Sequence, residues 1–260
     1  MEEHKIIENI QNPSGEIAVQ LNSINKSFKL KENRPNSIRE TVLGMFSDKK
    51  LKSIKALHDI NLTITKGESF GIIGRNGSGK STLLNIIMES IKPDKGGSVF
   101  TNGKLIRLAL GMGVDINLTA RDNIYVNGCV LGLSFKKIGM IFSDIINFAG
   151  LKDFIDTPVK FYSNGMKQRL LFSIAMHAEA DIFLLDEFFG GTGDRDFKAK
   201  SNLAFKEKIL EGKTIIIISH NLNIINRYCN NAMMLNHGKV VAIGNTESVI
   251  KTYQNSFEKK

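Results

Sequence analysis

The stretch that decides the fold is Gly74-Arg75-Asn76-Gly77-Ser78-Gly79-Lys80-Ser81-Thr82. A glycine, four residues and then Gly-Lys-Ser make the complete pattern of a phosphate-binding loop, which lies between a strand and a helix. Both flanks are present, because the apolar run Ser69–Ile73 predicts a buried strand and Leu83–Met88 predicts a helix. A glycine-rich turn with a chance lysine is the weaker interpretation. The stretch therefore predicts a site for nucleotide phosphates.

The residue types in this loop fit that chemistry. Gly74, Gly77 and Gly79 permit positive φ and a close approach of the backbone, so that successive N–H groups point into one concavity at a helix N-terminus. Lys80 is placed to reach the β- and γ-phosphates. The hydroxyl of Ser81 is placed to bind Mg²⁺, which takes oxygen ligands.

The composition is that of an ordinary globular protein. With 260 residues, 42% of them apolar and 23% charged, the chain suits one large domain or a core with a subdomain. The two cysteines, Cys129 and Cys229, lack metal-ligand spacing, which favours a reducing cytoplasm. No apolar run has the length of a membrane span, and the N-terminus lacks an apolar signal core, so we expect a cytoplasmic protein.

The early part of the chain predicts antiparallel β structure. Residues 1–15 are polar and predict a mobile arm. Apolar residues then alternate over Ile17–Leu21 and again over Ile60–Ile64, as in strands with one buried face. Asn102-Gly103, which lies between the apolar runs 98–100 and 105–106, predicts a β-hairpin.

Residues 26–55 predict a basic insertion, because nine basic and three acidic residues contribute +6 of the net charge of +9. Within it, Ser37 and Glu40 form a capping box. A short amphipathic helix is predicted from the spacing of the apolar residues Ile38, Val42, Met45 and Phe46. A surface helix that packs on its own domain explains this pattern about as well.

Residues 110–175 predict a helical subdomain. A capping box at Thr119 predicts a helix to about Leu131, and Ser134 opens a second helix that ends at Gly150. After this region come two uninterrupted apolar strands, 182–185 and 215–218, with the helix-like segment 198–211 between them. Such alternation predicts a parallel sheet that is covered on both faces.

Polar side chains follow these two apolar strands. Asp186 and Glu187 lie at the carboxyl end of the first strand, where ligands bind in open α/β folds. We expect Asp186 to hold Mg²⁺, directly or through water, and Glu187 to orient and polarise an attacking water. His220 follows the second strand and can contact the γ-phosphate. An acidic pair or a single histidine is weak evidence alone, and the phosphate loop favours the catalytic interpretation.

The order of these motifs resembles the nucleotide-binding subunit of ABC transporters from about Ile17 to Gln254. Residues 74–82 are similar to Walker A, Tyr162–Met166 to the signature motif and Ile182–Asp186 to Walker B. The resemblance implies an α/β P-loop ATPase core with a parallel sheet, an N-terminal antiparallel β subdomain and an α-helical subdomain. It assigns residues 16–254 to an ABC-type ATP-binding domain.

The resemblance also implies roles for single residues. Glu187 and His220 would be catalytic, and Ser81 and Asp186 would bind Mg²⁺. Residues that would bind ATP within the same copy are Phe28, Gly74, Arg75, Asn76, Gly77, Ser78, Gly79, Lys80, Ser81 and Thr82. Residues that a second copy would supply in trans are Ser163, Asn164, Gly165 and Asp194. Ser163 and the Gly165 amide would also cap a helix whose positive end faces an anion.

Within the family, the sequence is similar to the ATPases that export polysaccharides. Tyr-Ser-Asn-Gly-Met at 162–166 and the segments 118–125 and 154–160 carry this similarity, as does the basic insertion. It implies an ATP-hydrolysing homodimer on the cytoplasmic face of the inner or plasma membrane. Its partners would be a separate membrane permease and a lipid-linked glycan such as O-antigen, teichoic acid or capsule. Residues 255–260 would be a C-terminal tail.

Two other functions stay open at this point. The net charge of +9 also suits a soluble ABC-type ATPase that acts on nucleic acid or ribosomes, and a transporter ATPase could serve another substrate. The basic residues, however, lie beside an amphipathic helix instead of alternating with aromatic residues. This favours an anionic lipid surface or a lipid-linked phosphate, so no nucleic-acid partner is expected. No glutamine occurs between Leu105 and Thr119, where most transporter ATPases carry one that helps to bind Mg²⁺.

Overall fold

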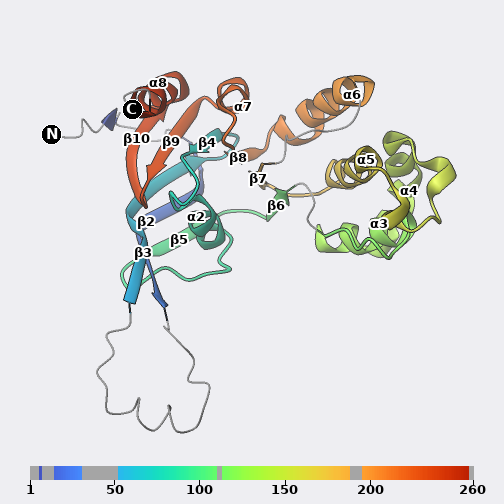
Figure 1. The fold of residues 1–260 in the computed structure, drawn as a ribbon, viewed down its shortest axis with the longest axis horizontal. Helices are drawn as coiled ribbons and strands as arrows, with labels where there is room; N and C mark the ends of the chain where they lie inside the picture. The colour runs from blue at the N-terminus through green and yellow to red at the C-terminus, as the bar shows by residue number, and fades with distance from the viewer. Residues whose placement is uncertain (1–5, 8–14, 31–51, 110–112, 188–194, 258–260) are drawn as a thin grey trace, which may run out of the picture.

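A computed structural model describes residues 6–7, 15–30, 52–109, 113–187 and 195–257 (Figure 1). The central element is a seven-stranded sheet in the order β1-β10-β9-β4-β8-β7-β6. Strands β6, β7, β8, β4 and β9 are parallel to their neighbours, while β10 runs antiparallel to β9. The strands are β1 (Ile6–Ile7), β4 (Ser69–Ile73), β6 (Leu105–Ala109), β7 (Ile182–Asp186), β8 (Thr214–Ile218), β9 (Asn231–Asn236) and β10 (Lys239–Asn245).

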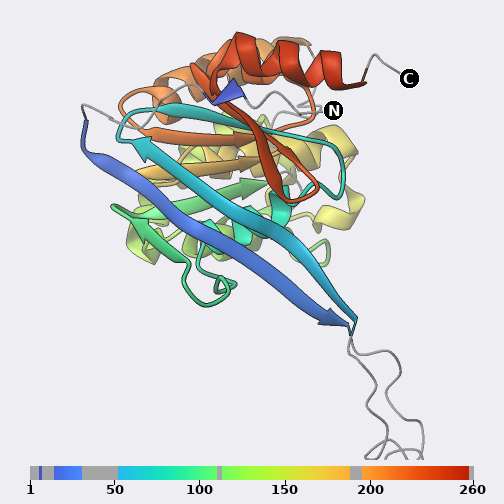
Figure 2. The ribbon, with the colours of Figure 1, turned by 90° about the vertical axis from the view of Figure 1, so that its left-hand side faces the viewer.

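A second, three-stranded sheet is antiparallel, as the alternation near the N-terminus predicts. It has the order β3-β2-β5, with β2 at Ile17–Leu30, β3 at Lys52–Thr65 and β5 at Ser98–Thr101. Figure 2 shows β2 and β3 as long neighbouring strands that cross one side of the molecule. Both strands extend into the predicted basic insertion, so its described ends, residues 26–30 and 52–55, are strand.

The predicted hairpin at Asn102-Gly103 is wrong, because β5 and β6 belong to different sheets. The backbone N–H of Asn102 donates to the Ala18 carbonyl of the small sheet, 2.8 Å away. Two residues later, the N–H of Lys104 donates to a carboxylate oxygen of Asp181, 2.7 Å away, at the start of β7. Gly103, with φ of 129°, is therefore the point at which the chain crosses from the small sheet to the large sheet.

Both faces of the large sheet are buried, as its uninterrupted apolar strands predict. Ile182 and Leu184 of β7 pack on one face with four residues of α2 (Lys80–Ile87) and with the small sheet. Phe183 and Leu185 pack on the other face. The helices that cover this second face are α5 (Asn164–Ala175), α6 (Arg195–Phe205), α7 (Leu222–Tyr228) and α8 (Thr246–Phe257).

The helices α3 (Ala120–Val130), α4 (Phe135–Ala149) and α5 form a group with its own apolar core (Figure 1). The predicted caps are present, because the side chain of Thr119 accepts from the Asp122 N–H and that of Ser134 from the Lys137 N–H. Helix α4 ends at Gly150 in the left-handed conformation. Short 3₁₀ turns at Lys152–Phe154 and Val159–Phe161 connect α4 to α5.

Several sequence predictions differ from the structure or lie outside its described part. The predicted helix 198–211 consists of α6 and a π-helical turn at Lys206–Leu210. Two residues of the predicted N-terminal arm form β1, which pairs with β10. Residues 255–257 of the predicted tail belong to α8. The rest of residues 1–14, the amphipathic helix of the insertion, Asp194 and residues 258–260 lie outside the described residues. Among the described helices, none combines the length and the apolar character needed to cross a bilayer.

Candidate functional site

The phosphate loop connects β4 to α2 and forms one wall of a pocket of about 590 Å³. Gly74, Gly77 and Gly79 have φ of 155°, 78° and 108°, so the loop uses the backbone freedom that its glycines provide. A Cβ on Gly79 would lie 2.9 Å from the Ala56 carbonyl oxygen. The pocket is lined by Ile54, Lys55, Ala56, Asn76, Gly77, Gly79, Lys80, Ser81, Thr82, Asp186, Glu187, Ile218 and His237.

The amino group of Lys80 lies inside the loop. Its Nζ donates to the carbonyl of Gly74 at 2.6 Å and to that of Arg75 at 3.0 Å. Burial lowers the pKa of Lys80, and the nearby carboxylates of Glu187 and Asp186 oppose this shift. An ammonium group binds charged phosphate oxygens more strongly than neutral carbonyls, so a bound nucleotide would replace the two carbonyls as the partners of Lys80.

Asp186 lies at the end of β7 and shares the pocket with Ser81. A carboxylate and a hydroxyl in one pocket fit Mg²⁺, which prefers oxygen ligands and keeps several waters. The carboxylate of Asp186 also forms an ion pair with Arg107 of β6, in which Nη2 and Oδ2 are 2.5 Å apart. Arg107 is not among the residues that the sequence motifs predict for the site.

Glu187 and His220, the two predicted catalytic residues, are in direct contact. Nδ1 of His220 is 2.8 Å from Oε2 of Glu187, and the His220 backbone N–H donates to Oε1 at 3.0 Å. The hydroxyl of Ser219 is 3.4 Å from Oε2. These contacts join the ends of β7 and β8, and they hold the carboxylate while it still lines the pocket.

Three of the residues predicted to act in trans, Ser163, Asn164 and Gly165, lie in the helical group and do not line this pocket, and the fourth, Asp194, lies outside the described residues. Ser163 is the N-cap of α5, and its side chain accepts from the Met166 N–H at 3.2 Å. Asn164 and Gly165 form the first turn of that helix. The positive end of the α5 helix dipole is therefore at Ser163–Gly165, outside the pocket that the phosphate loop lines.

The structure places Phe28 beside the pocket and not in its wall. Phe28 of β2 pairs with Ile54 of β3, and Ile54 is the residue that lines the pocket. Both side chains are partly exposed, 37% for Phe28 and 52% for Ile54. Because directly paired residues share one face of a sheet, Phe28 extends the apolar surface that Ile54 begins.

Sequence reasoning missed a second wall of the pocket, the turn His237-Gly238 between β9 and β10. The His58 N–H donates to the Gly238 carbonyl at 2.8 Å, and the Gly238 N–H donates to the Ser78 carbonyl at 2.9 Å. His237 itself lines the pocket. The Asn-His-Gly sequence signals a turn, but no local signal connects it to a loop about 160 residues earlier.

A phosphate loop, two carboxylates at the carboxyl edge of a parallel sheet and a histidine in contact with one of them define a P-loop ATPase. The family model that describes the ABC transporter matches residues 57–190. The chain belongs to this family.

Similar proteins agree with this assignment. The O-antigen export system ATP-binding protein RfbB of Klebsiella pneumoniae is 36% identical, over 93% of this chain and 99% of its own length. The teichoic acids export ATP-binding protein TagH of Enterococcus faecalis is 38% identical over 92% of this chain. The chain spans 53% of the length of that relative.

Solved structures share the fold. A dimeric structure of the ATP-binding cassette MJ0796 in a post-hydrolysis state, bound to ADP and Pi, has a TM-score of 0.66 and 23% identity. The match covers 88% of this chain and 98% of that one. A structure described as the ATP binding subunit of an ABC transporter has a TM-score of 0.67 and 19% identity, over 91% and 93% of the two chains.

Proposed function

We propose that this protein is the ATP-hydrolysing subunit of an exporter that moves a lipid-linked polysaccharide, of the O-antigen, teichoic acid or capsule class, across the cytoplasmic membrane. The observation that carries the ATPase part is the contact between Glu187 and His220 at the edge of the phosphate-loop pocket. The similarity to RfbB over nearly the whole of both chains supports the choice of a polysaccharide as the cargo.

The residues of the pocket have different roles in ATP hydrolysis. Lys80 and the loop amides bind the β- and γ-phosphates, and Ser81 and Asp186 would hold Mg²⁺, which would supply positive charge to the phosphates. Glu187 would orient and polarise the attacking water toward the γ-phosphate and accept its proton. His220 holds the Glu187 carboxylate through Nδ1, and its other ring nitrogen would contact the γ-phosphate.

We also propose that two copies enclose two ATP molecules. The phosphate loop of one copy would face Ser163, Asn164 and Gly165 of the other, with Asp194 nearby. The N-terminus of α5 supports this arrangement, because the first backbone N–H groups of a helix and the positive end of its dipole suit an anion. The fold is shared with a cassette whose solved structure is dimeric.

A membrane permease would bind this dimer at the cytoplasmic face of the membrane, and ATP hydrolysis by the dimer would drive transport through it. The helical group carries exposed apolar side chains that suit a protein partner, namely Val130, Phe135, Met140 and Phe161. The basic segment 26–55 supports a position near anionic lipid.

Replacing Glu187 tests this proposal. We expect Glu187→Gln to slow ATP hydrolysis by about 100-fold or more, because a glutamine cannot accept the proton of the attacking water. Nucleotide binding should persist, since Lys80 and the loop are intact. In the native host, the variant should retain lipid-linked glycan in the cell and reduce surface glycan.

The control is Glu179→Gln, which removes an exposed carboxylate paired with Lys137 outside the pocket. It should hydrolyse ATP and export glycan like the unmodified protein. Unchanged hydrolysis in Glu187→Gln would contradict the catalytic assignment. Lost hydrolysis with normal surface glycan would contradict the export function alone.

A further inference from the structure

The ion pair between Arg107 and Asp186 places a permanent positive charge on the carboxylate that Mg²⁺ would use. Both side chains are mostly buried, with 24% of Arg107 and 20% of Asp186 exposed. A guanidinium stays protonated at every physiological pH, so its charge can be removed from this carboxylate only by movement. In such a mostly buried site, this positive charge strongly repels any cation that approaches.

The register of the sheet explains how the two side chains meet. Arg107 of β6 lies opposite Leu184 of β7, and Ala109 lies opposite Asp186. Leu184 and Asp186 are two residues apart, so Arg107 and Asp186 project from the same face of the sheet. The long side chain of Arg107 therefore needs to reach forward by only two positions along the neighbouring strand.

The contact is held by one nitrogen. Nη2 of Arg107 donates to Oδ2 of Asp186, and among the described residues Nε of Arg107 is buried without a hydrogen-bond partner. A two-nitrogen fork would be stronger and more rigid than this single bond. The pair is close and charged, yet it satisfies Arg107 incompletely, which suits a contact that is exchanged during function.

We propose that Arg107 is a positioning residue that competes with Mg²⁺ for the carboxylate of Asp186. This inference rests on the proposed role of Asp186 as a metal ligand. Without metal, Arg107 neutralises Asp186 and keeps its negative charge from repelling the incoming triphosphate. When Mg²⁺ binds with the nucleotide, the Asp186 carboxylate would serve the metal, directly or through water, and the Arg107 guanidinium would release it. Arg107 thereby sets the Mg²⁺ concentration at which the pocket accepts the nucleotide.

The test is a Mg²⁺ titration of the binding of a fluorescent, non-hydrolysable ATP analogue to the full chain. We expect Arg107→Gln to lower the Mg²⁺ concentration at half-maximal binding by about tenfold, because a unit positive charge next to the metal oxygens is gone. In the absence of Mg²⁺, the same variant should bind the analogue more weakly, by about tenfold, because Asp186 is no longer neutralised. A general loss of structure would not lower the Mg²⁺ concentration needed for binding and at the same time weaken binding in the absence of Mg²⁺.

Two further variants complete the test. Arg107→Lys keeps the charge and should leave the Mg²⁺ midpoint close to that of the unmodified protein, and it covers the case in which Arg107→Gln does not fold. Arg121→Gln is the matched control, because Arg121 forms a surface ion pair with Asp156, at 2.8 Å, in the helical group. It should leave both quantities unchanged.

The possible failures can be told apart. A Mg²⁺ midpoint that is unchanged or raised in Arg107→Gln overturns the inference, provided that Asp186→Asn raises the midpoint strongly. If Asp186→Asn also leaves the midpoint unchanged, the metal role of Asp186 is wrong, and the inference about Arg107 falls with it.

Discussion

Lys80 shows how a single residue prepares the pocket for an anion. Its ammonium is half-buried, and burial lowers its pKa, because low polarity disfavours the charged form. Two backbone carbonyls compensate only in part. A bound triphosphate would supply full negative charges at the same atom, so ligand binding relieves an unfavourable environment in addition to making new contacts.

Removing this amino group should therefore weaken nucleotide binding. We expect Lys80→Ala to reduce the affinity for a fluorescent ATP analogue by about 10- to 100-fold, which corresponds to the loss of one hydrogen bond to a charged group. Equilibrium titration measures the effect. Lys66→Ala, which removes an exposed lysine paired with Glu16, is the control and should bind normally. Equal affinities for the two variants would contradict the role of Lys80.

At the scale of elements, the turn between β9 and β10 supports the phosphate loop. Gly238 donates to the Ser78 carbonyl and accepts from the His58 N–H, so the turn joins the loop to β3. Its φ is 74°, and a Cβ at this position would lie 2.3 Å from the Ala56 carbonyl oxygen. The close approach of three backbone segments requires a glycine here.

A methyl group at Gly238 should push these segments apart. We expect Gly238→Ala to lower the free energy of unfolding by about 2–4 kcal/mol, from the unfavourable φ and the backbone clash together, and to weaken nucleotide binding. Gly67→Ala is a matched control, because Gly67 has φ of 77° but open space around it. It should cost about 1 kcal/mol and leave binding intact. Chemical denaturation and nucleotide titration measure both, and equal effects would show that the clash is absent.

Contacts between residues that are close in sequence could be predicted, and contacts between distant segments could not. The caps at Thr119, Ser134 and Ser163 depend on residues within three positions, so the sequence alone predicts them. The turn at Asn102-Gly103 carries an equally strong local signal, but the partners of β5 and β6 lie far away in sequence. The contact of Arg107 with Asp186 depends on strand order in the same way.

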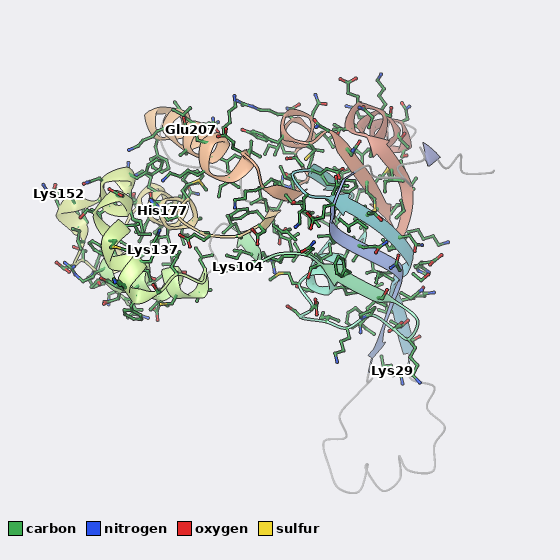
Figure 3. The ribbon with its side chains drawn as sticks, turned by 180° about the vertical axis from the view of Figure 1, so that it is seen from behind. Lys29, Lys104, Lys137, Lys152, His177 and Glu207 are labelled. Atoms are coloured by element: carbon green, nitrogen blue, oxygen red, sulfur yellow. The ribbon has the colours of Figure 1, made fainter. Side chains whose placement is uncertain are left out.

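At the scale of the whole molecule, His177 follows α5 and lies between the helical group and the π-helical turn that carries Glu207 (Figure 3). Its Nδ1 is 2.8 Å from the Ser173 carbonyl oxygen of α5, and its Nε2 is 3.4 Å from the Nζ of Lys208 in the π-helical turn. Burial lowers the pKa of His177, and the positive charges of Lys208 and Lys137 lower it further. The carboxylate of Asp144 and the Ser173 carbonyl oppose this shift.

The stability of the protein should therefore fall in mild acid. The pKa of His177 in the folded state lies below its unfolded value of about 6.5, so the unfolded state binds more protons between these two values. The free energy of unfolding is thus fully retained above pH 6.5 and decreases as the pH falls through this window. In His177→Gln, thermal melts at pH 7.5 and pH 5.5 should differ less than those of the unmodified protein. An identical difference would exclude His177 as a source of the pH dependence.

The position of α2 between the two sheets has a consequence for the order of folding. The buried residues of α2 contact strands of both sheets, and β2 joins β3 and β5, which are about 35 and 80 residues away along the chain. These long-range pairings have a large entropic cost of loop closure, so they form slowly. The first turn of α2 completes the phosphate loop, and Gly79 of this loop lies close to Ala56 and Leu57 of β3, so the contacts that shape the loop come from both sheets. We therefore expect the protein to bind nucleotide only after both sheets have folded, and a folding intermediate with one sheet formed should not bind nucleotide.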